Sequence, residues 1–246
     1  MKSNRTVVIT GAAGGMGTLV VERFLANGDT VIATDCNEEG LKRLPGAYGA
    51  DIKLQTVAGD VTSEKDCQAV ADLAKKATGH VDVFVSVAGY FPTQSFDETT
   101  AADFRRVIDI NLTGAFLMIK ALHPLMKGRG WGRIVIIGSA STFEGIPDQI
   151  HYVAAKAGLF GLARSLAREF GKDGITVNVV TPGLTLTPIV KKTSPSAVLE
   201  LQPKTRSIPR DERPEDLIGP IFYLASPDAD FISGQTVNVD GGKHMV

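Results

Sequence analysis

The sequence predicts an α/β fold in which helices cover both faces of a doubly wound, seven-stranded parallel sheet. Short runs rich in β-branched residues alternate along the chain with longer segments whose apolar residues recur at helical spacing. That alternation is typical of a parallel sheet built from strand-helix-strand units. No repeat, low-complexity segment or shift in composition divides the 246 residues, so we expect residues 1–246 to form a single domain.

Seven short runs are predicted to be buried strands because β-branched and aliphatic residues dominate each of them. They are Thr6–Thr10, Thr30–Thr34, Ile52–Val57, Val81–Val87, Arg133–Gly138, Ile175–Val180 and Gln235–Val239. Longer segments between them, with apolar residues three and four apart, are predicted to be helices. They are Met16–Ala26, Ser63–Thr78, Ala101–Met126, His151–Phe170 and a last helix that begins near Pro214–Asp216 and ends near Ala225.

The least regular stretch is Thr185–Arg213, which is rich in Pro, Ser, Thr and Lys. It is longer than the usual connection in a compact domain, and loops of that length often serve as binding loops or lids. We therefore expect a mobile substrate lid over about residues 185–213.

The charge balance argues for small-molecule chemistry. The chain has 26 Lys and Arg residues against 27 Asp and Glu residues, so no strong field favours nucleic acid or an anionic membrane. The N-terminal segment has no apolar run long enough for a signal peptide, and no run of about 18 apolar residues occurs. We expect a cytoplasmic enzyme with a small-molecule substrate and without a membrane anchor.

The sequence gives no pattern for a metal site. Cys36 and Cys67 lack Cys-x-x-Cys spacing and are expected to be free thiols. The four histidines are scattered without the spacing of metal ligands, which disfavours a zinc dehydrogenase. We expect no metal.

A glycine-rich segment, TGAAGGMG over residues 10–17, lies between the first predicted strand and the first predicted helix. Glycines let the backbone approach a pyrophosphate closely, and a helix N-terminus supplies free N–H groups with a partial positive charge. This position favours a Rossmann-like dinucleotide site, although a glycine-rich turn without a ligand has the same pattern. The candidate cofactor-binding residues here are Gly11, Ala13, Gly14, Gly15, Met16 and Gly17.

Asp35 follows the second predicted strand, where a carboxylate can accept hydrogen bonds from the hydroxyls of the adenosine ribose. The same carboxylate would repel the 2′-phosphate of NADP. Neither the glycine loop nor Cys36, Asn37 and Glu38 offer an Arg or Lys to pair with that phosphate. We expect NAD as the cofactor, with Asp35 and Cys36 beside the ribose.

Tyr152 and Lys156 are four residues apart in a predicted helix, so both side chains lie on one face. A phenol has an ordinary pKa of about 10, and a nearby ammonium favours the phenolate. The pair could therefore run general acid–base catalysis near neutral pH. The Tyr-x-x-x-Lys spacing alone is weak, because it arises by chance in many chains.

In combination, the motifs resemble those of the short-chain dehydrogenase/reductase family over nearly the whole chain. The motifs that carry the resemblance are Gly11-x-x-x-Gly15-x-Gly17, Asp60-Val61, Ala88-Gly89, Asn111, Ser139, Tyr152-x-x-x-Lys156, Pro182-Gly183 with Thr187, Ser233-Gly234-Gln235 and Asp240-Gly241-Gly242. Their order and spacing agree with the family, including the step from Ser139 to Tyr152.

The resemblance implies a role for each matching residue. Tyr152 would take the hydroxyl proton in oxidation or give it to the carbonyl oxygen in reduction. Ser139 would hydrogen-bond the same substrate oxygen. Lys156 would hold the nicotinamide ribose and lower the pKa of Tyr152, and Asn111 would hold a water that links Lys156 to solvent.

The resemblance also implies the cofactor contacts and the assembly. Asp60 and Val61 would contact the adenine, Ala88 and Gly89 would pass along the cofactor, and Pro182 to Thr187 would hold the nicotinamide carboxamide. In that last segment the candidate residues are Pro182, Gly183, Thr185 and Thr187. The family also suggests a homotetramer that uses the two long helices and the C-terminal strand as interfaces.

Two positions depart from the family pattern. Ser86 and Val87 stand where the family usually has Asn-Asn, so an Asn that ties neighbouring strands together is missing. Thr185 stands where a branched aliphatic residue is common. The first departure affects sheet stability or cofactor affinity rather than the proton chemistry.

The residues expected to line the substrate pocket are mostly apolar. They are Tyr90, Phe91, Ser139, Ser141, Phe143, Ile146, Gln149, Ile150, Tyr152 and Leu184. A hydrophobic secondary alcohol or its ketone, cyclic and aromatic ones included, is therefore the expected substrate.

Two alternatives stay open. The predicted lid carries basic residues that could meet an acyl carrier protein, as in a 3-oxoacyl-(acyl-carrier-protein) reductase, although Asp35 disfavours NADPH. They are Lys191, Lys192, Lys204, Arg206 and Arg210. The other alternative is a catalytically silent dinucleotide sensor, which the presence of all four catalytic residues disfavours. A serine hydrolase is disfavoured because Ser139 lacks the Gly-x-Ser-x-Gly elbow.

Overall fold

The structure is a computed structural model that describes residues 4–48 and 52–246, and it confirms the predicted α/β fold. Seven parallel strands form one sheet in the order β3-β2-β1-β4-β5-β6-β7. They are β1 (Thr6–Thr10), β2 (Thr30–Asp35), β3 (Leu54–Ala58), β4 (Val83–Ser86), β5 (Gly132–Ile137), β6 (Ile175–Pro182) and β7 (Thr236–Val239). The order reverses between β1 and β4, and in open α/β sheets ligands bind outside the carboxyl ends of the strands at such a point.

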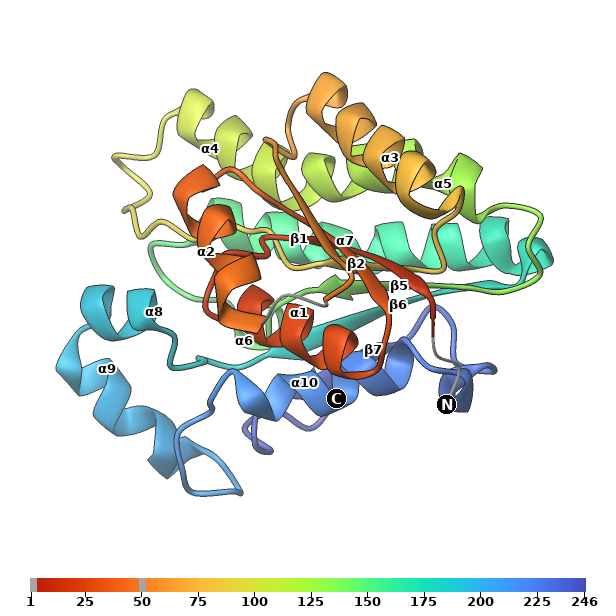
Figure 1. The fold of residues 1–246 in the computed structure, drawn as a ribbon. Coiled ribbons are helices and arrows are strands. Elements are labelled where there is room, and N and C mark those ends of the chain that lie inside the picture. The colour runs from red at the N-terminus through yellow and green to blue at the C-terminus, as the bar shows by residue number, and fades with distance from the viewer. Residues whose placement is uncertain (1–3, 49–51) are drawn as a thin grey trace.

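Helices cover both faces of the sheet (Figure 1). One face carries α1 (Gly17–Ala26), α2 (Glu38–Tyr48) and α10 (Glu215–Leu224), and the other carries α3 (Glu64–Thr78), α5 (Gly114–Met126) and α7 (Ile150–Phe170). Helix α2 was not predicted, because its segment contains Gly40, Pro45 and Gly46 and so lacks a clear helical pattern. Among the described residues, no helix is both long and apolar enough to cross a bilayer.

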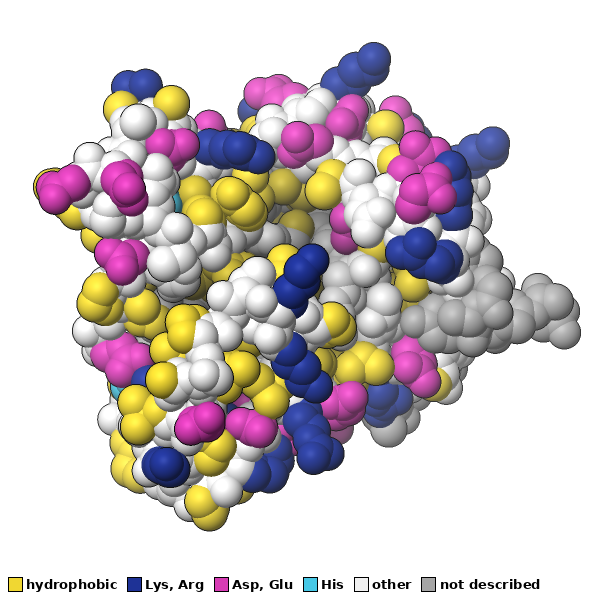
Figure 2. Space-filling view, turned by 90° about the vertical axis from the view of Figure 1, so that its left-hand side faces the viewer, with side chains coloured by type: hydrophobic (Ala, Val, Ile, Leu, Met, Phe, Trp, Pro, Cys, Tyr) yellow, Lys and Arg dark blue, Asp and Glu magenta, His cyan; other side chains and the backbone are white. Residues whose placement is uncertain are grey.

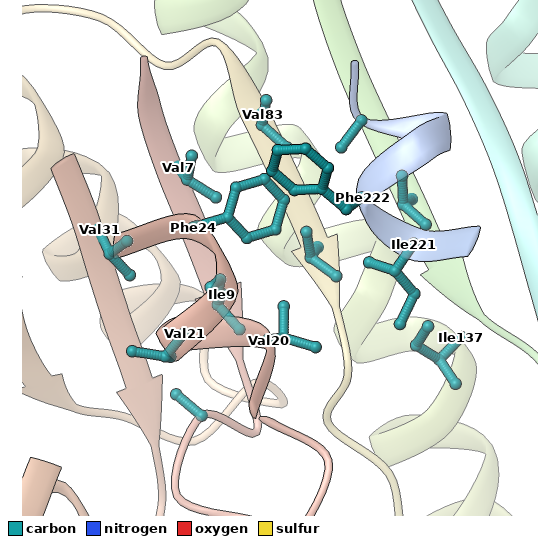
Figure 3. Packing of buried hydrophobic residues seen from close by; sticks show 14 of the residues in the cluster. Val7, Ile9, Val20, Val21, Phe24, Val31, Val83, Ile137, Ile221 and Phe222 are labelled. Atoms are coloured by element: carbon teal, nitrogen blue, oxygen red, sulfur yellow. The ribbon is translucent and has the colours of Figure 1, made fainter. Parts of the chain in front are cut away.

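Alternate residues of each strand belong to two cores on opposite sides of the sheet. On β1, Val7 and Ile9 contact the core beneath α1 and α10, whereas Val8 contacts the core beneath α3, α5 and α7. Phe24 of α1 is fully buried, and its ring centroid lies 5.3 Å from that of Phe222 of α10 (Figure 3). This packing fixes α1 on the sheet and with it the glycine loop that precedes α1.

The segment predicted as one helix, Ala101–Met126, is divided. It consists of α4 (Ala101–Ile108), a π-helical turn η1 (Asp109–Thr113) and α5. Across the turn, the Gly114 N–H donates to the Asp109 carbonyl oxygen, five residues earlier, instead of the usual four. π-helical turns inside α-helices often occur at functional sites.

The predicted lid is more regular than expected. It contains α8 (Pro188–Thr193), α9 (Ser196–Leu201) and a 3₁₀ turn η3 (Gln202–Thr205). The Thr187 side chain caps α8 by accepting from the Val190 N–H at 3.4 Å, and Pro188 occupies the first helical position, where its missing N–H costs nothing. The expectation of an irregular segment was wrong because these helices are too short to give a periodic pattern.

Candidate active site

The loops after β1, β2, β4, β5 and β6 meet at one edge of the sheet, because parallel strands end on the same side. Figure 2 shows this face, with a hollow between the α4 side above and the α8–α9 segment below. Hydrophobic side chains gather in the hollow and along the α8–α9 segment. Most of the residues predicted for the site belong to these loops or to the strand ends that lead into them. The rest lie after β3, at the start of α1, or on η1, α6 (Ser141–Glu144) and α7.

The loop between β1 and α1 requires glycine. Gly11 has φ +65°, in the left-handed region that favours glycine, and a Cβ there would lie 2.7 Å from the Ala88 backbone nitrogen. A Cβ on Gly17 would lie 2.0 Å from the Gly11 carbonyl oxygen. No side chain caps the first turn of α1 at Met16. The loop is therefore a bare-backbone cradle at a helix N-terminus, which suits a pyrophosphate.

Asp35 ends β2 beside this cradle. Its Oδ2 accepts from the Ala13 N–H at 3.0 Å and its Oδ1 accepts from the Asn37 N–H at 2.9 Å. On the adjoining α2, Lys42 is paired with Glu38 and Glu39 at 3.1 and 2.9 Å. The end of β2 is thus acidic, and its neighbouring lysine is already paired with carboxylates.

The segment after β3 is held by side-chain hydrogen bonds. Asp60 Oδ1 accepts from both the N–H and the hydroxyl of Thr62 at 2.8 Å, and the Asp60 N–H donates to Asp66 at 3.0 Å. Val61 lies against Gly114, where a Cβ would come within 2.7 Å of its side chain. The predicted adenine contacts therefore lie between β3 and the start of α5.

The segment after β4 makes up for the missing family asparagine in another way. The Ala88 N–H donates to the Thr10 hydroxyl at 3.3 Å, which joins the ends of β1 and β4. Ser86 is buried as the last residue of β4 and is paired in register with Thr10 of β1 and Ile136 of β5. The strands on both sides of the switch point thus remain connected without that asparagine.

Three polar side chains meet where α7 faces the end of β5. Lys156 is buried, and its Nζ donates to the carbonyl oxygen of Ile137, the last residue of β5, at 2.8 Å. The Lys156 Nζ lies 5.7 Å from the ring centroid of Tyr152, one helical turn earlier. The Ser139 side chain hydrogen-bonds that of Tyr152, and its Oγ lies 2.8 Å from that of Ser141.

The π-helical turn directs Asn111 into the same region. Asn111 is buried, and its Nδ2 donates to the carbonyl oxygens of Tyr90 at 2.7 Å and of Val107 at 3.0 Å. Its Oδ1 accepts from the Tyr90 N–H at 3.2 Å. A Cβ on Gly89 would lie 3.0 Å from Asn111 Oδ1 and 3.4 Å from Lys156 Nζ. A side chain at position 89 would therefore crowd both Asn111 and Lys156.

The pKa directions follow from burial. Burial raises the pKa of Tyr152 above its ordinary value, and the hydrogen bond with Ser139 opposes this only in part. Burial also lowers the pKa of Lys156 from 10.5 to about 8. The net direction for Tyr152 is therefore upward, because burial outweighs the influence of Lys156, whose own ammonium is desolvated and donates to Ile137. At neutral pH the phenol is protonated and Lys156 is mostly charged.

The solved structure of a short-chain dehydrogenase/reductase from Brucella melitensis, also named a glucose/ribitol dehydrogenase, matches this fold with a TM-score of 0.94. It is 32% identical, and the match covers 99% of this chain and 98% of that one. A protein family described as Enoyl-(Acyl carrier protein) reductase matches residues 11–244. The chain belongs to the short-chain dehydrogenase/reductase family.

Relatives in the short-chain dehydrogenase/reductase family differ in their substrates. The chain is 35% identical to 2,3-dihydroxy-2,3-dihydro-p-cumate dehydrogenase of Pseudomonas putida, and the match covers 98% of the chain and 95% of that protein. It is 33% identical to the 3-oxoacyl-(acyl-carrier-protein) reductase of Salmonella typhimurium, with 98% of both covered. An uncharacterized short-chain type dehydrogenase/reductase of Sinorhizobium fredii is 36% identical over 98% of the chain, which spans only 44% of that protein's length.

This short-chain dehydrogenase/reductase is an oxidoreductase with the fold that binds a nicotinamide dinucleotide. The described residues suit that cofactor. The Gly11 and Gly17 positions cannot hold a Cβ, which leaves the backbone open to a pyrophosphate, and Asp35 lies beside the loop where a ribose would be. The bare backbone at Gly89 lies beside Asn111 and Lys156, so a cofactor passing along it would have its nicotinamide end near these two side chains.

The substrate side of the cleft is only partly as predicted. The ring of Phe91 meets that of Tyr152 edge to face at 6.2 Å between centroids, and Ile146 and Ile150 are exposed. Phe143 instead packs against Phe160 of α7 at 5.9 Å, and its ring lies 6.1 Å from that of His244.

Of three further predicted pocket residues, Tyr90 and Leu184 contact arginines, and Gln149 lies directly before α7. The ring of Tyr90 lies under the guanidinium of Arg106 at 5.3 Å. Gln149 is the residue before α7, and the Leu184 carbonyl oxygen accepts from Arg206 at 3.1 Å. The predicted pocket of this short-chain dehydrogenase/reductase therefore has exposed apolar side chains at Ile146 and Ile150, and a backbone carbonyl at Leu184 that Arg206 holds in place.

A buried ionic cluster at the base of the lid was not predicted from the sequence. Arg206 is 6% exposed and lies 3.7 Å from the carboxylate of Glu212, which is 5% exposed. Arg210 forms two hydrogen bonds with Asp216 at 2.6 and 2.7 Å. Arg206 and Arg210, which the alternative of an acyl-carrier-protein reductase places toward an acidic partner, are thus paired with carboxylates of this chain. A pair formed across an irregular segment leaves no periodic pattern in the sequence.

Proposed function

We propose that this chain is an NAD(H)-dependent oxidoreductase that interconverts a hydrophobic secondary alcohol and its ketone, with Tyr152 as general acid and base. The observation that carries the proposal is the meeting of Tyr152, Ser139 and Lys156 at the end of β5, the strand next to the switch point between β1 and β4. A phenol and a hydroxyl that already hydrogen-bond each other can both reach one substrate oxygen.

The side chains divide the proton chemistry between them. Ser139 would donate a hydrogen bond to the substrate oxygen and orient it toward Tyr152. Tyr152 would give its proton to that oxygen in reduction, or remove it in oxidation. Lys156 would stabilise the resulting phenolate by its charge, and Asn111 would hold the loop at Tyr90 in place. The nicotinamide, when bound, supplies or accepts the hydride at the substrate carbon.

NAD is favoured by the acidic end of β2, and this yields a test. Replacement of Asp35 and Cys36 by Ser and Arg removes the carboxylate and adds a partner for a 2′-phosphate, so kcat/KM for NADP⁺ relative to NAD⁺ should rise by about 10²-fold. Steady-state kinetics with both cofactors measure the ratio. The Glu64→Gln variant, which removes an exposed carboxylate at the start of α3, should leave the ratio unchanged. A wild type that prefers NADP⁺ would contradict the proposal.

The substrate class is supported by the apolar residues around Tyr152. Phe91 lies against the Tyr152 ring, and the exposed Ile146 and Ile150 belong to the segment before it. One relative is named for a cyclic dihydrodiol, which is a hydroxylated carbocycle. NADH formation should therefore be seen with cyclic secondary alcohols and cis-dihydrodiols, and short polar polyols should turn over slowly. Cofactor binding without turnover of any alcohol or ketone would favour a dinucleotide sensor.

A 3-oxoacyl-(acyl-carrier-protein) reductase is the second candidate. The Salmonella typhimurium reductase of that name is 33% identical over nearly the whole chain, and three exposed lysines remain on the lid. They are Lys191, Lys192 and Lys204. NADPH-dependent reduction of a 3-oxoacyl thioester at a higher kcat/KM than any cyclic ketone would favour this candidate.

We also propose a homotetramer. Exposed aromatic side chains on the predicted interface helices support it, with Phe104 at 38% and Phe116 at 43% exposed. Analytical ultracentrifugation would give the mass of the assembly in solution and so the number of subunits.

A further inference from the structure

A buried carboxylate joins the two ends of the lid. Glu212, near the C-terminal end of the lid, accepts from the Gly183 N–H at 3.0 Å through Oε2 and from the Thr185 hydroxyl at 2.6 Å through Oε1. Its backbone carbonyl accepts from the Leu186 N–H at 2.8 Å. These three contacts hold Glu212 against the segment that leaves β6, so the lid is a closed loop at its base.

Arg206 completes the cluster from inside the lid. Its Nη2 lies 3.7 Å from Glu212 Oε2 and donates to the Leu184 carbonyl oxygen at 3.1 Å. Its Nη1 donates to the Arg210 carbonyl oxygen at 3.1 Å. The side chains of Arg206 and Glu212 are only 1% and 4% exposed, so the ion pair is shielded from water.

The segment held in this way leads directly to the phosphate loop. The Thr187 N–H donates to the Thr185 carbonyl oxygen at 2.8 Å, and Thr187 caps α8. A Cβ on Gly15 would lie 3.1 Å from the Pro188 ring and 3.3 Å from Thr187 Cβ. Glu212 therefore holds Thr185, Thr185 hydrogen-bonds Thr187, and Thr187 lies against Gly15 of the glycine loop.

We propose that Glu212 and Arg206 are positioning residues that hold the segment from Gly183 to Thr187 against Gly15 and thereby close the cofactor cleft. Neither residue touches the reacting atoms. The cluster raises the affinity for the dinucleotide by fixing the backbone from Gly183 to Thr187 and the start of α8. This inference rests on the proposed function, because it requires that a dinucleotide binds in the cleft.

The test measures NADH binding rather than turnover, using the enhancement of NADH fluorescence on the intact protein. Glu212→Gln keeps the size of the side chain and removes the charge opposite Arg206. Thr185→Val keeps the shape and removes only the hydroxyl. Each variant should raise the Kd for NADH by about tenfold, because a buried hydrogen bond that orders the cleft is lost. In turnover, KM for the cofactor should rise more than kcat falls.

Matched variants on the same lid provide controls. Glu200→Gln removes an exposed carboxylate of α9, and Thr193→Val removes a hydroxyl that donates only to the Ile189 carbonyl oxygen. Both should bind NADH as the wild type does. Amide hydrogen exchange gives a second reading, in which Gly183 and Leu186 should exchange faster in Glu212→Gln while the β1 and β4 amides keep their protection.

The outcomes separate the two proposals. A wild type that binds neither NADH nor NADPH would overturn the proposed function. A wild type that binds NADH while folded Glu212→Gln and Thr185→Val bind it equally well would overturn the positioning role alone. If Glu212→Gln fails to fold, Thr185→Val decides by itself, since it leaves the Glu212–Arg206 pair in place.

Discussion

Replacement of Tyr152 by Phe should lower kcat by about 10²–10⁴-fold in both directions while the Kd for NADH stays unchanged. The substitution removes only the phenolic oxygen, so the edge contact with Phe91 remains possible. Without that oxygen, the group that exchanges the proton with the substrate oxygen in the proposed mechanism is missing. Initial-rate kinetics on the best alcohol and its ketone, with a fluorescence titration of NADH, measure both quantities.

The direction of the Tyr152 pKa adds a pH signature. Because burial raises this pKa, the protonated phenol predominates at neutral pH, and ketone reduction should be fastest there. Alcohol oxidation needs the phenolate, so its rate should rise as the pH increases into the alkaline range. Tyr223→Phe, which changes a half-exposed tyrosine on α10, is the matched control and should behave as the wild type does. Equal turnover by Tyr152→Phe would assign the proton step to another group.

Replacement of Lys156 by Met should remove activity and stabilise the fold. We expect a loss of kcat of about 10²-fold or more, because the phenolate loses its nearby positive charge. Lowering the Lys156 pKa from 10.5 to about 8 corresponds to a cost of about 3 kcal/mol for burying the charge below pH 8. The lost hydrogen bond to Ile137 offsets part of the gain, which leaves about 1–2 kcal/mol of added stability at pH 7.

The pH dependence checks the sign of this effect. Between pH 8 and 10.5 the unfolded wild type binds more protons at this lysine than the folded form does, so this lysine contributes stability that rises with pH in that window. Lys156→Met should lack that contribution. Urea unfolding at pH 7 and at about pH 10 measures it, with Lys65→Met, an exposed lysine of α3, as the control. A less stable Lys156→Met variant at pH 7 would show that the hydrogen bond to Ile137 outweighs the buried charge.

The parts of the fold that follow from local pattern could be predicted. The β-branched runs gave all seven strands, with ends displaced by up to two residues, because buried parallel strands consist of continuous apolar segments. The spacing of Tyr152 and Lys156 placed both on one face of α7, as observed. Asp35 was expected just beyond a strand and is its last residue.

Features that depend on distant partners could not be predicted. Glu212 is held by Thr185, 27 residues away, and no periodicity connects the two. The ring of Phe143, on α6 (Ser141–Glu144), stacks on that of Phe160 of α7, 17 positions later, and residue type alone does not predict this contact. Lys156 was expected to lower the Tyr152 pKa, but the depth of burial of both groups decides the direction, and burial is a property of the folded chain.

The π-helical turn at Asp109–Thr113 amounts to one residue inserted into an otherwise regular helix, and each residue advances a helix by about 100°. The turn therefore puts α4 and α5 out of phase with each other. Deleting one residue within it would restore a uniform helix, but it would rotate the apolar side of α5 away from the sheet or Asn111 away from Tyr90. A regular helix could not place both groups correctly. The π-helical turn therefore allows α5 to pack its apolar side on the sheet while Asn111, in the middle of the same helical segment, faces the cleft.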